Sequence, residues 1–100
     1  MLTKSSKVEY VLYCKAPRWN NDIYFLARPD EFSSLTFYRG RDYSKYNKFR
    51  FQSYKELEDY YERILTYKLH SHHSTDIYFY KKIINSAEQT EEYYFANQTK

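Results

Sequence analysis

The fold is decided by residues 53–69, SYKELEDYYERILTYKL. Ser53 followed by Glu56 is a capping box, in which the hydroxyl accepts a hydrogen bond from the Glu56 amide and the carboxylate reaches back to the amide of the cap. Apolar residues then recur in steps of three and four and form one stripe, which consists of Tyr54, Leu57, Tyr61, Ile64, Leu65 and Leu69. The stretch is therefore predicted to be an amphipathic helix over about residues 53–69.

Shorter segments on both sides of this helix alternate in the manner of β-strands. Five strands are expected at residues 7–15, 23–28, 35–39, 48–52 and 76–84, with an edge strand or a frayed helix at 91–96. Because no second long helix is expected to cover the stripe, its partner surface is predicted to be a sheet. The predicted fold class is α+β with two layers. A mainly antiparallel sheet of four to six strands carries the helix on one face, in the order β-β-β-β-α-β(-β).

The alternation also assigns residues to the two faces of that sheet. The positions expected to face the core are Val8, Tyr10, Leu12, Cys14, Ile23, Phe25, Ala27, Leu35, Phe37, Ile77, Phe79 and Ile83. The alternate phase carries Tyr13, Tyr24, Tyr38, Tyr78, Tyr80, Lys15, Arg28, Arg50 and Lys82. Since one helix covers one face, this second set is expected to form an open surface. Half-buried packing or an isologous homodimer is favoured over RNA binding there, because the RRM signature is absent.

Length and composition restrict the class of protein. One hundred residues with 42% apolar content predict one globular domain over 1–100, with disordered tails at 1–6 and 97–100. No run approaches the ~20 apolar residues of a membrane span, and the N-terminus lacks the apolar stretch of a signal peptide. We therefore expect a cytoplasmic protein without membrane association. The single glycine, Gly40, argues against a phosphate-cradling loop, and the single Cys14 agrees with a reducing compartment.

Positive charge is concentrated in one segment of the chain. Residues 39–50 hold five cations and one anion, a net of +4, although the whole chain carries +3. Tyrosines interleave with these cations, which suits an acidic protein surface or phosphate contact with base stacking; a solvated loop is the alternative. The expected partner-binding residues are Trp19, Tyr38, Arg39, Arg41, Tyr43, Lys45, Tyr46, Lys48 and Arg50.

The one metal-like cluster consists of His70, His72 and His73, with Asp76 nearby, because imidazoles and a carboxylate can hold zinc or manganese. With the Tyr-x-x-x-Lys spacing of Tyr78 and Lys82, it resembles the HUH-type single-strand nucleases. It departs from them at Ser71, where that family has a bulky apolar residue. It departs also in the position of the tyrosine, which the family carries on a separate downstream helix. The alternative is a loop whose histidines complement the helix dipole.

Three functions follow as hypotheses, in this order of preference. The first is a non-enzymatic binding protein without catalytic residues, metal or cofactor. It would be an inhibitor or accessory factor of a phage or mobile element, for example an anti-defence factor, that contacts a host or defence-system protein. The order of elements is similar to that of many short accessory proteins of phages and plasmids, a resemblance that carries no diagnostic motif. The second is a nucleic-acid binder that uses the basic 39–50 segment and an open tyrosine face of the sheet. The third is a metal-dependent nuclease built on the histidines.

Overall fold

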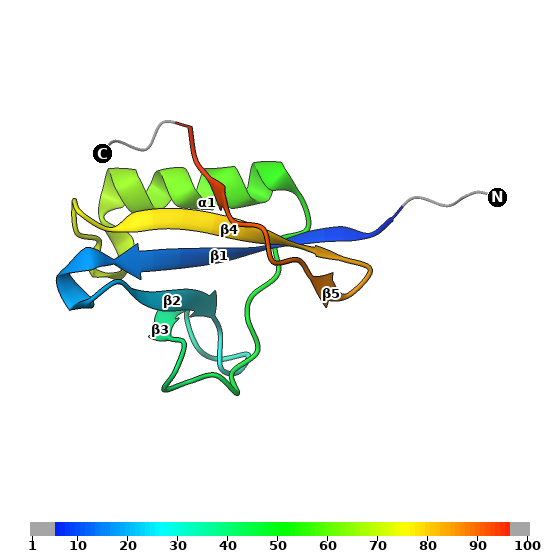
Figure 1. Ribbon diagram of the computed structural model, residues 1–100, viewed down its shortest axis with the longest axis horizontal. Coiled ribbons are helices and arrows are strands. Elements are labelled where there is room, and N and C mark those ends of the chain that lie inside the picture. Colours follow the sequence, from blue (N-terminus) through cyan, green and yellow to red (C-terminus); the bar gives the residue numbers. More distant parts are fainter. Residues whose placement is uncertain (1–5, 97–100) are drawn as a thin grey trace.

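The computed structural model describes residues 6–96, in which one α-helix lies against an antiparallel sheet (Figure 1). The α+β class predicted from the sequence is confirmed. The tails predicted at 1–6 and 97–100 lie outside the described residues except for Ser6, which is exposed. The elements are β1 (Val8–Ala16), η1 (Pro17–Trp19), β2 (Asp22–Ala27), β3 (Thr36–Arg39), α1 (Tyr54–Tyr67), η2 (Leu69–Ser71), β4 (Ile77–Ile84), β5 (Ala87–Glu88) and β6 (Tyr93–Tyr94).

Helix α1 begins at the predicted cap. The Ser53 hydroxyl accepts a hydrogen bond from the Glu56 amide at 3.2 Å, whereas the Glu56 carboxylate accepts from the amide of Gln52, one residue before the cap. The helix ends earlier than residue 69, because Lys68 adopts a left-handed conformation with φ 53°. Its buried face consists of Leu57, Tyr61 and Ile64, which belong to the predicted stripe.

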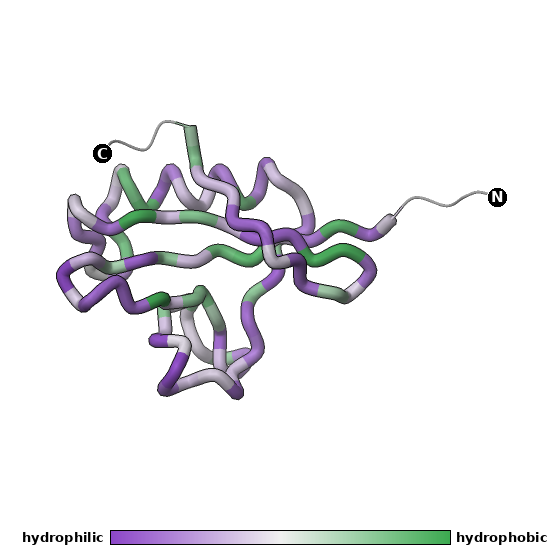
Figure 2. The backbone as a smooth tube through the Cα atoms, in the orientation of Figure 1, coloured by the Kyte–Doolittle hydropathy of each residue, from purple (hydrophilic) through white to green (hydrophobic). Residues whose placement is uncertain are grey.

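The sheet is ordered β3-β2-β1-β4-β5, and β6 pairs with the other end of β4. Its centre is the long pairing of β1 with β4, in which Val8 lies opposite Ile84 and Lys15 opposite Ile77. The first two strands, β1 and β2, form an antiparallel hairpin with Tyr13 opposite Phe25. Figure 2 shows hydrophobic residues along β1 and β4 and hydrophilic residues in the loop that follows β3.

The segment predicted as a strand at 48–52 forms two isolated bridges instead of a ladder. Lys48 bridges to Ala27 of β2, and Phe51 bridges to Tyr10 of β1. The pairing of β1 with β2 ends at Tyr13 and Phe25, so the two strands are free to separate beyond this point. Residues 48–51 contact one strand and then the other across this opening, which prevents a continuous ladder with either of them.

Both faces of the sheet are buried, which corrects the predicted open tyrosine face. Cross-strand neighbours of an antiparallel sheet share a face, and Cys14 lies opposite Tyr24 and Tyr78. These tyrosines and Tyr80 therefore pack under α1. On the far face a second buried cluster consists of Val11, Tyr13, Phe25, Ala27, Phe79 and Ile83. The phases predicted for β2 and β4 were wrong because both phases of these strands are apolar or aromatic, so hydrophobicity alone does not distinguish them.

Two buried tyrosines between the helix and the sheet, Tyr61 of α1 and Tyr78 of β4, differ in the environment of their hydroxyl groups. Tyr61 is 1% exposed and stacks on Phe95, and its hydroxyl has no hydrogen-bond partner within residues 6–96. Tyr78 is 2% exposed, and its hydroxyl is hydrogen-bonded to His72 Nδ1 at 2.9 Å. A buried polar group without a partner destabilises a protein, whereas a satisfied one does not.

We expect Tyr61→Phe to raise the free energy of unfolding by about 1 kcal/mol, because it removes an unsatisfied buried hydroxyl. The matched variant Tyr78→Phe should lower it by about 1 kcal/mol, because it leaves the imidazole of His72 without its partner. Urea unfolding of both variants measures the two changes. Loss of stability in Tyr61→Phe as large as that in Tyr78→Phe would show that the Tyr61 hydroxyl is satisfied in solution.

Candidate functional site

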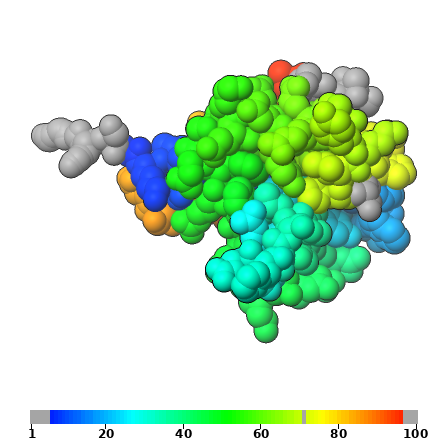
Figure 3. All heavy atoms as spheres, turned by 180° about the vertical axis from the view of Figure 1, so that it is seen from behind, coloured from blue at the N-terminus to red at the C-terminus, as the bar shows by residue number. Residues whose placement is uncertain are grey.

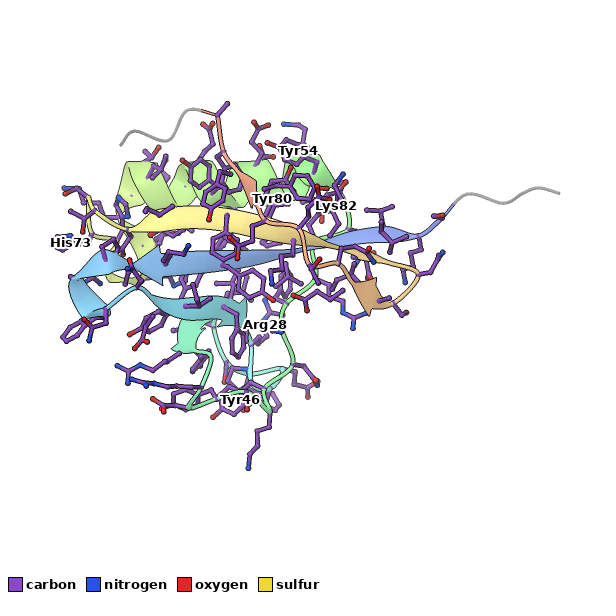
Figure 4. All side chains as sticks on the ribbon, viewed as in Figure 1. Arg28, Tyr46, Tyr54, His73, Tyr80 and Lys82 are labelled. Carbon is purple, nitrogen blue, oxygen red and sulfur yellow. The ribbon has the colours of Figure 1, made fainter. Side chains whose placement is uncertain are left out.

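Three tyrosines form a ring cluster on the side of the sheet away from α1. This tyrosine cluster consists of Tyr38 of β3 and Tyr43 and Tyr46 of the following loop, with ring centroids 5.0 to 5.2 Å apart. Tyr38 also packs on Phe25 and so joins the cluster to the second core. Tyr43 is 40% exposed, and Figure 4 shows Tyr46 on the loop that lies farthest from the helix. The cluster is thus rooted in the core and open to solvent at its outer edge.

Backbone hydrogen bonds hold the loop that carries these rings. The Tyr43 amide donates to the carbonyl of Arg39 at 3.0 Å, and the Tyr46 amide donates to the carbonyl of Tyr43 at 2.9 Å. The Gly40 amide donates to the carbonyl of Ile23 at 2.9 Å, and a Cβ at this position would lie 3.3 Å from that oxygen. The single glycine of the chain therefore permits a close approach of the loop to β2.

Most cations of the 39–50 segment are paired with carboxylates from distant parts of the chain. Arg39 and Arg41 both contact Asp22 of β2, at 3.4 Å each, and Arg39 contacts Asp42 at 3.3 Å. Lys48 contacts Glu88 at 3.4 Å, and Arg50 contacts Glu9 at 3.3 Å. Lys45 alone of the five has no carboxylate partner within residues 6–96. The net of +4 counted along the segment therefore overstates the positive field at this surface.

Glu9 is a buried carboxylate that anchors the end of this segment to β1. Its side chain accepts a hydrogen bond from Gln52 Nε2 at 2.9 Å and is 3.3 Å from Arg50 Nη1. The hydrogen bond from Gln52 lowers the pKa of Glu9, and the charges of Lys7 and Arg50 act in the same direction against the effect of burial. Arg50 therefore helps to hold residues 50–52 against β1 through its ion pair with Glu9, although its side chain remains exposed.

Trp19 lies at the tip of the β1–β2 hairpin and is 53% exposed. Two asparagines complete this turn with positive φ, 58° at Asn20 and 60° at Asn21. The preceding Arg18 forms an ion pair with Asp76, next to the start of β4. The hairpin tip is therefore fixed at both ends. Asp22, which follows Asn21, forms ion pairs with Arg39 and Arg41. The hairpin tip and the 39–50 segment therefore meet along one edge of the sheet.

A second group of cations, of which Lys48 alone belongs to the expected site, lies over the second core. This lysine cluster consists of Lys15, Lys48 and Lys81. The ammonium groups of Lys48 and Lys81 lie 5.6 and 5.4 Å from the centroid of the Tyr13 ring, and that of Lys15 lies 5.7 Å from the centroid of Phe79. Lys81 follows Phe79 by two residues and therefore points to the same face of β4. A correct assignment of the faces of β4 from the sequence would have placed Lys81 over the second core.

One carboxylate lies in this group of cations. Glu88 accepts hydrogen bonds from the Tyr13 hydroxyl and from Lys48, while Lys15 and Lys81 lack a carboxylate partner within the described part of the chain. Burial, followed by the interactions with Glu88, raises the pKa of Tyr13 and keeps the phenol protonated as a donor. A groove of about 520 Å³ beside the group is lined by Ser44, Tyr46, Asn47, Lys48, Arg50, Ile83 and Glu88.

The three histidines face three different partners. His70 Nε2 is hydrogen-bonded to the Tyr60 hydroxyl, His72 Nδ1 to Tyr78 and His73 Nδ1 to Thr75. Figure 4 shows His73 at one end of the molecule. Within residues 6–96, no group of three His, Cys, Asp or Glu side chains is placed to hold a metal ion. The geometry of the described residues therefore gives the metal-dependent nuclease no support.

The tyrosine and the thiol that a catalytic hypothesis would use are both buried. Tyr78 is 2% exposed and Cys14 is 6% exposed. Burial raises the pKa of each group and favours the protonated form, which is a poor nucleophile. Both line a cavity of about 190 Å³ together with Ala16, Arg18, Tyr24, Phe37, His70 and Asp76.

Comparison with known proteins adds no family to this description. No model of a protein family matches the chain, and no curated protein or solved structure matches it either. Among the described residues, no helix has both the length and the apolar character needed to cross a membrane. The functional argument therefore rests on the geometry of the chain itself.

We expect the free energy of unfolding to decrease as the pH falls below about 6.5, the pKa of histidine in an unfolded chain. Burial lowers the pKa of His70 and of His72, so the unfolded state binds protons at a higher pH than the folded state. The stabilisation is complete above about pH 6.5 and is lost as the pH drops through the folded values. Urea unfolding between about pH 7.5 and 5.5 measures this slope.

The double variant His70→Asn, His72→Asn should have a flatter profile over the same interval, because asparagine does not titrate there. Asparagine also tolerates the positive φ of 57° at His70. Equal slopes in the wild type and the double variant would contradict this origin of the pH dependence.

Proposed function

We propose that this protein is a non-enzymatic binding protein that contacts a partner protein through the tyrosine cluster, with Trp19, Arg41 and Lys45 beside it. The observation that carries the proposal is a set of three mutually packed tyrosine rings, fixed at its base in the core and exposed at Tyr43. Tyrosine, tryptophan and arginine are the residues that most often dominate the binding energy of protein interfaces. Rings that are already held in place lose little conformational freedom on binding.

The charges around the tyrosine cluster favour a protein over a nucleic acid. Asp22 and Asp42 lie among the arginines of this surface and would repel a phosphate backbone. A protein surface of mixed charge meets both signs without such repulsion. Arg41, whose side chain is 71% exposed, and Lys45, which has no carboxylate partner among residues 6–96, leave a modest positive excess. An acidic or mixed region of the partner therefore complements this surface best.

The biological role that we propose is that of an inhibitor or accessory factor of a phage or mobile element. A host or defence-system protein would be its target in the cytoplasm of the host cell, and anti-defence is one such role. A small α+β domain that presents a pre-formed aromatic surface suits such a factor, because blocking a partner requires contact area and no chemistry.

Tyr43→Ala should weaken capture of the partner by about 30-fold, or about 2 kcal/mol, because it removes the exposed ring of the tyrosine cluster. Lys45→Glu should weaken capture less and in a salt-dependent manner. Pull-down from lysate of the native host, followed by titration of the captured protein, measures both effects. Tyr67→Ala, which removes an aromatic side chain 69% exposed on the helix, is the control and should bind as the wild type does.

Thermal unfolding of these variants separates binding from folding. Lys45 is exposed, so Lys45→Glu should leave the melting temperature close to that of the wild type. Tyr43→Ala removes ring contacts with Tyr38 and Tyr46 and should lower the melting temperature slightly while the protein stays folded. Undiminished capture by a folded Tyr43→Ala variant would show that the partner contacts another surface.

The lysine cluster favours nucleic acid as a second candidate partner. Three ammonium groups lie over neighbouring rings of the second core, and Glu88 is the one carboxylate that contacts them among the described residues. An uncompensated group of cations attracts phosphates. The rings beneath are Tyr13, Phe25 and Phe79, each at most 5% exposed, so stacking with bases is not available at this place. Such binding would therefore depend on phosphate contacts and would be insensitive to sequence.

If the second candidate is correct, log K should fall with log salt at a slope of roughly −2 to −3, as expected for about three phosphate contacts. Lys81→Ala should reduce the slope by about one, whereas Lys55→Ala on the exposed side of the helix should not change it. Gel-shift titrations with single-stranded and double-stranded DNA and RNA measure these slopes. Absence of binding at ~50 mM salt would eliminate nucleic acid as the partner.

A further inference from the structure

An ordered turn presents one phenylalanine to solvent. Phe32 lies in the connection between β2 and β3 and is 90% exposed. Asp30 organises the turn: its Oδ1 accepts hydrogen bonds from the Phe32 amide at 2.9 Å and from the Ser33 hydroxyl at 3.1 Å, and its carbonyl accepts from the Ser33 amide at 3.1 Å. This is an Asx turn, which fixes the backbone locally. The ring is therefore held away from the core by a defined structure.

An apolar groove lies next to this turn, between the same connection and α1. Its walls are Leu35, Phe49, Phe51 and Tyr60, and its volume is about 300 Å³. Leu35 is three residues from Phe32, so the exposed ring and the groove belong to one surface. Figure 3 shows the connection, in cyan, projecting from the molecule beside the helix, in green.

The rim of the groove carries both signs of charge. Glu56, Asp59 and Arg63 of α1 line it, and the guanidinium group of Arg28 lies 5.6 Å from the centroid of the Phe49 ring. A strongly acidic or strongly basic segment would meet like charges on one part of this rim. A surface with the same arrangement, turned by a two-fold rotation, would meet opposite charges at both ends.

We propose that a second copy of this chain occupies the groove, forming an isologous dimer in which Phe32 of each protomer enters the groove of the other. A two-fold interface is self-complementary and needs a projection and a matching recess on one surface, which Phe32 and the groove provide. The proposed dimer pairs Arg63 of one protomer with Glu56 and Asp59 on the rim of the other. This dimer uses a different surface from the open tyrosine face expected from the sequence, and it does not depend on the proposed partner protein.

The test is the mass of the protein in solution as a function of concentration. Sedimentation equilibrium of the wild type should give a mass that rises from 12.4 kDa toward twice that value as the concentration increases. Phe32→Ser should remain at the monomer mass, and its thermal stability should be unchanged because the ring makes no buried contacts. Tyr67→Ser, also at an exposed aromatic residue, is the matched control and should dimerise as the wild type does.

Charge exchange across the rim tests the two-fold geometry itself. Arg63→Glu and Asp59→Arg should each abolish self-association, because both create like charges at the two symmetry-related contacts. An equimolar mixture of these two variants should form a heterodimer, in which both contacts again have opposite charges. A wild type that stays monomeric up to its solubility limit overturns the proposal. Self-association that Phe32→Ser leaves intact, or a mixture that stays monomeric, overturns it as well.

Discussion

The structure depends on one feature of the sheet, the placement of residues 48–51 between β1 and β2. These strands pair only near the hairpin, and beyond it the segment is hydrogen-bonded to both, through the Phe49 amide to Leu26 and through Phe51 to Tyr10. Glu9 secures the arrangement by accepting a hydrogen bond from Gln52 and pairing with Arg50. The segment closes an opening that would otherwise expose the backbone of two strands. It also connects the loop that bears the tyrosine cluster directly to α1.

This placement explains why the far face of the sheet is not open. The loop that leads into the segment carries Tyr46 and Lys48 across the second core, where Tyr13 stacks on Phe79. One helix therefore covers one face, and the aromatic side chains of a loop help to cover the other. Lysine side chains complete the cover, with the ammonium groups of Lys15, Lys48 and Lys81 over the rings of Phe79 and Tyr13. The exposed tyrosine surface is consequently small, and it lies at the edge of this cover.

The sequence predicts those parts of the molecule that depend on local signals. The cap at Ser53 and the helical stripe involve residues within a few positions of one another, and both are present. The faces of β2 could not be predicted, because Phe25 with Ala27 and Tyr24 with Leu26 are equally suited to burial. Alternation of apolar and polar residues identifies the buried face of a strand only when the other face is in solvent. It fails where a strand is covered on both sides.

The candidate site shows the same division between local and distant information. The cations of the 39–50 segment are evident in the sequence. Most of the carboxylates that pair with them, however, are distant along the chain. Glu9 is 41 residues from Arg50, and Glu88 is 40 residues from Lys48. Only the folded chain brings these groups together, and the pairing turns an apparently basic loop into a surface of mixed charge. In the interface that we propose, the paired arginines would bond the partner and Tyr43 would supply the apolar contact. This mixed charge is the reason that we propose a protein, and not a polyanion, as the partner.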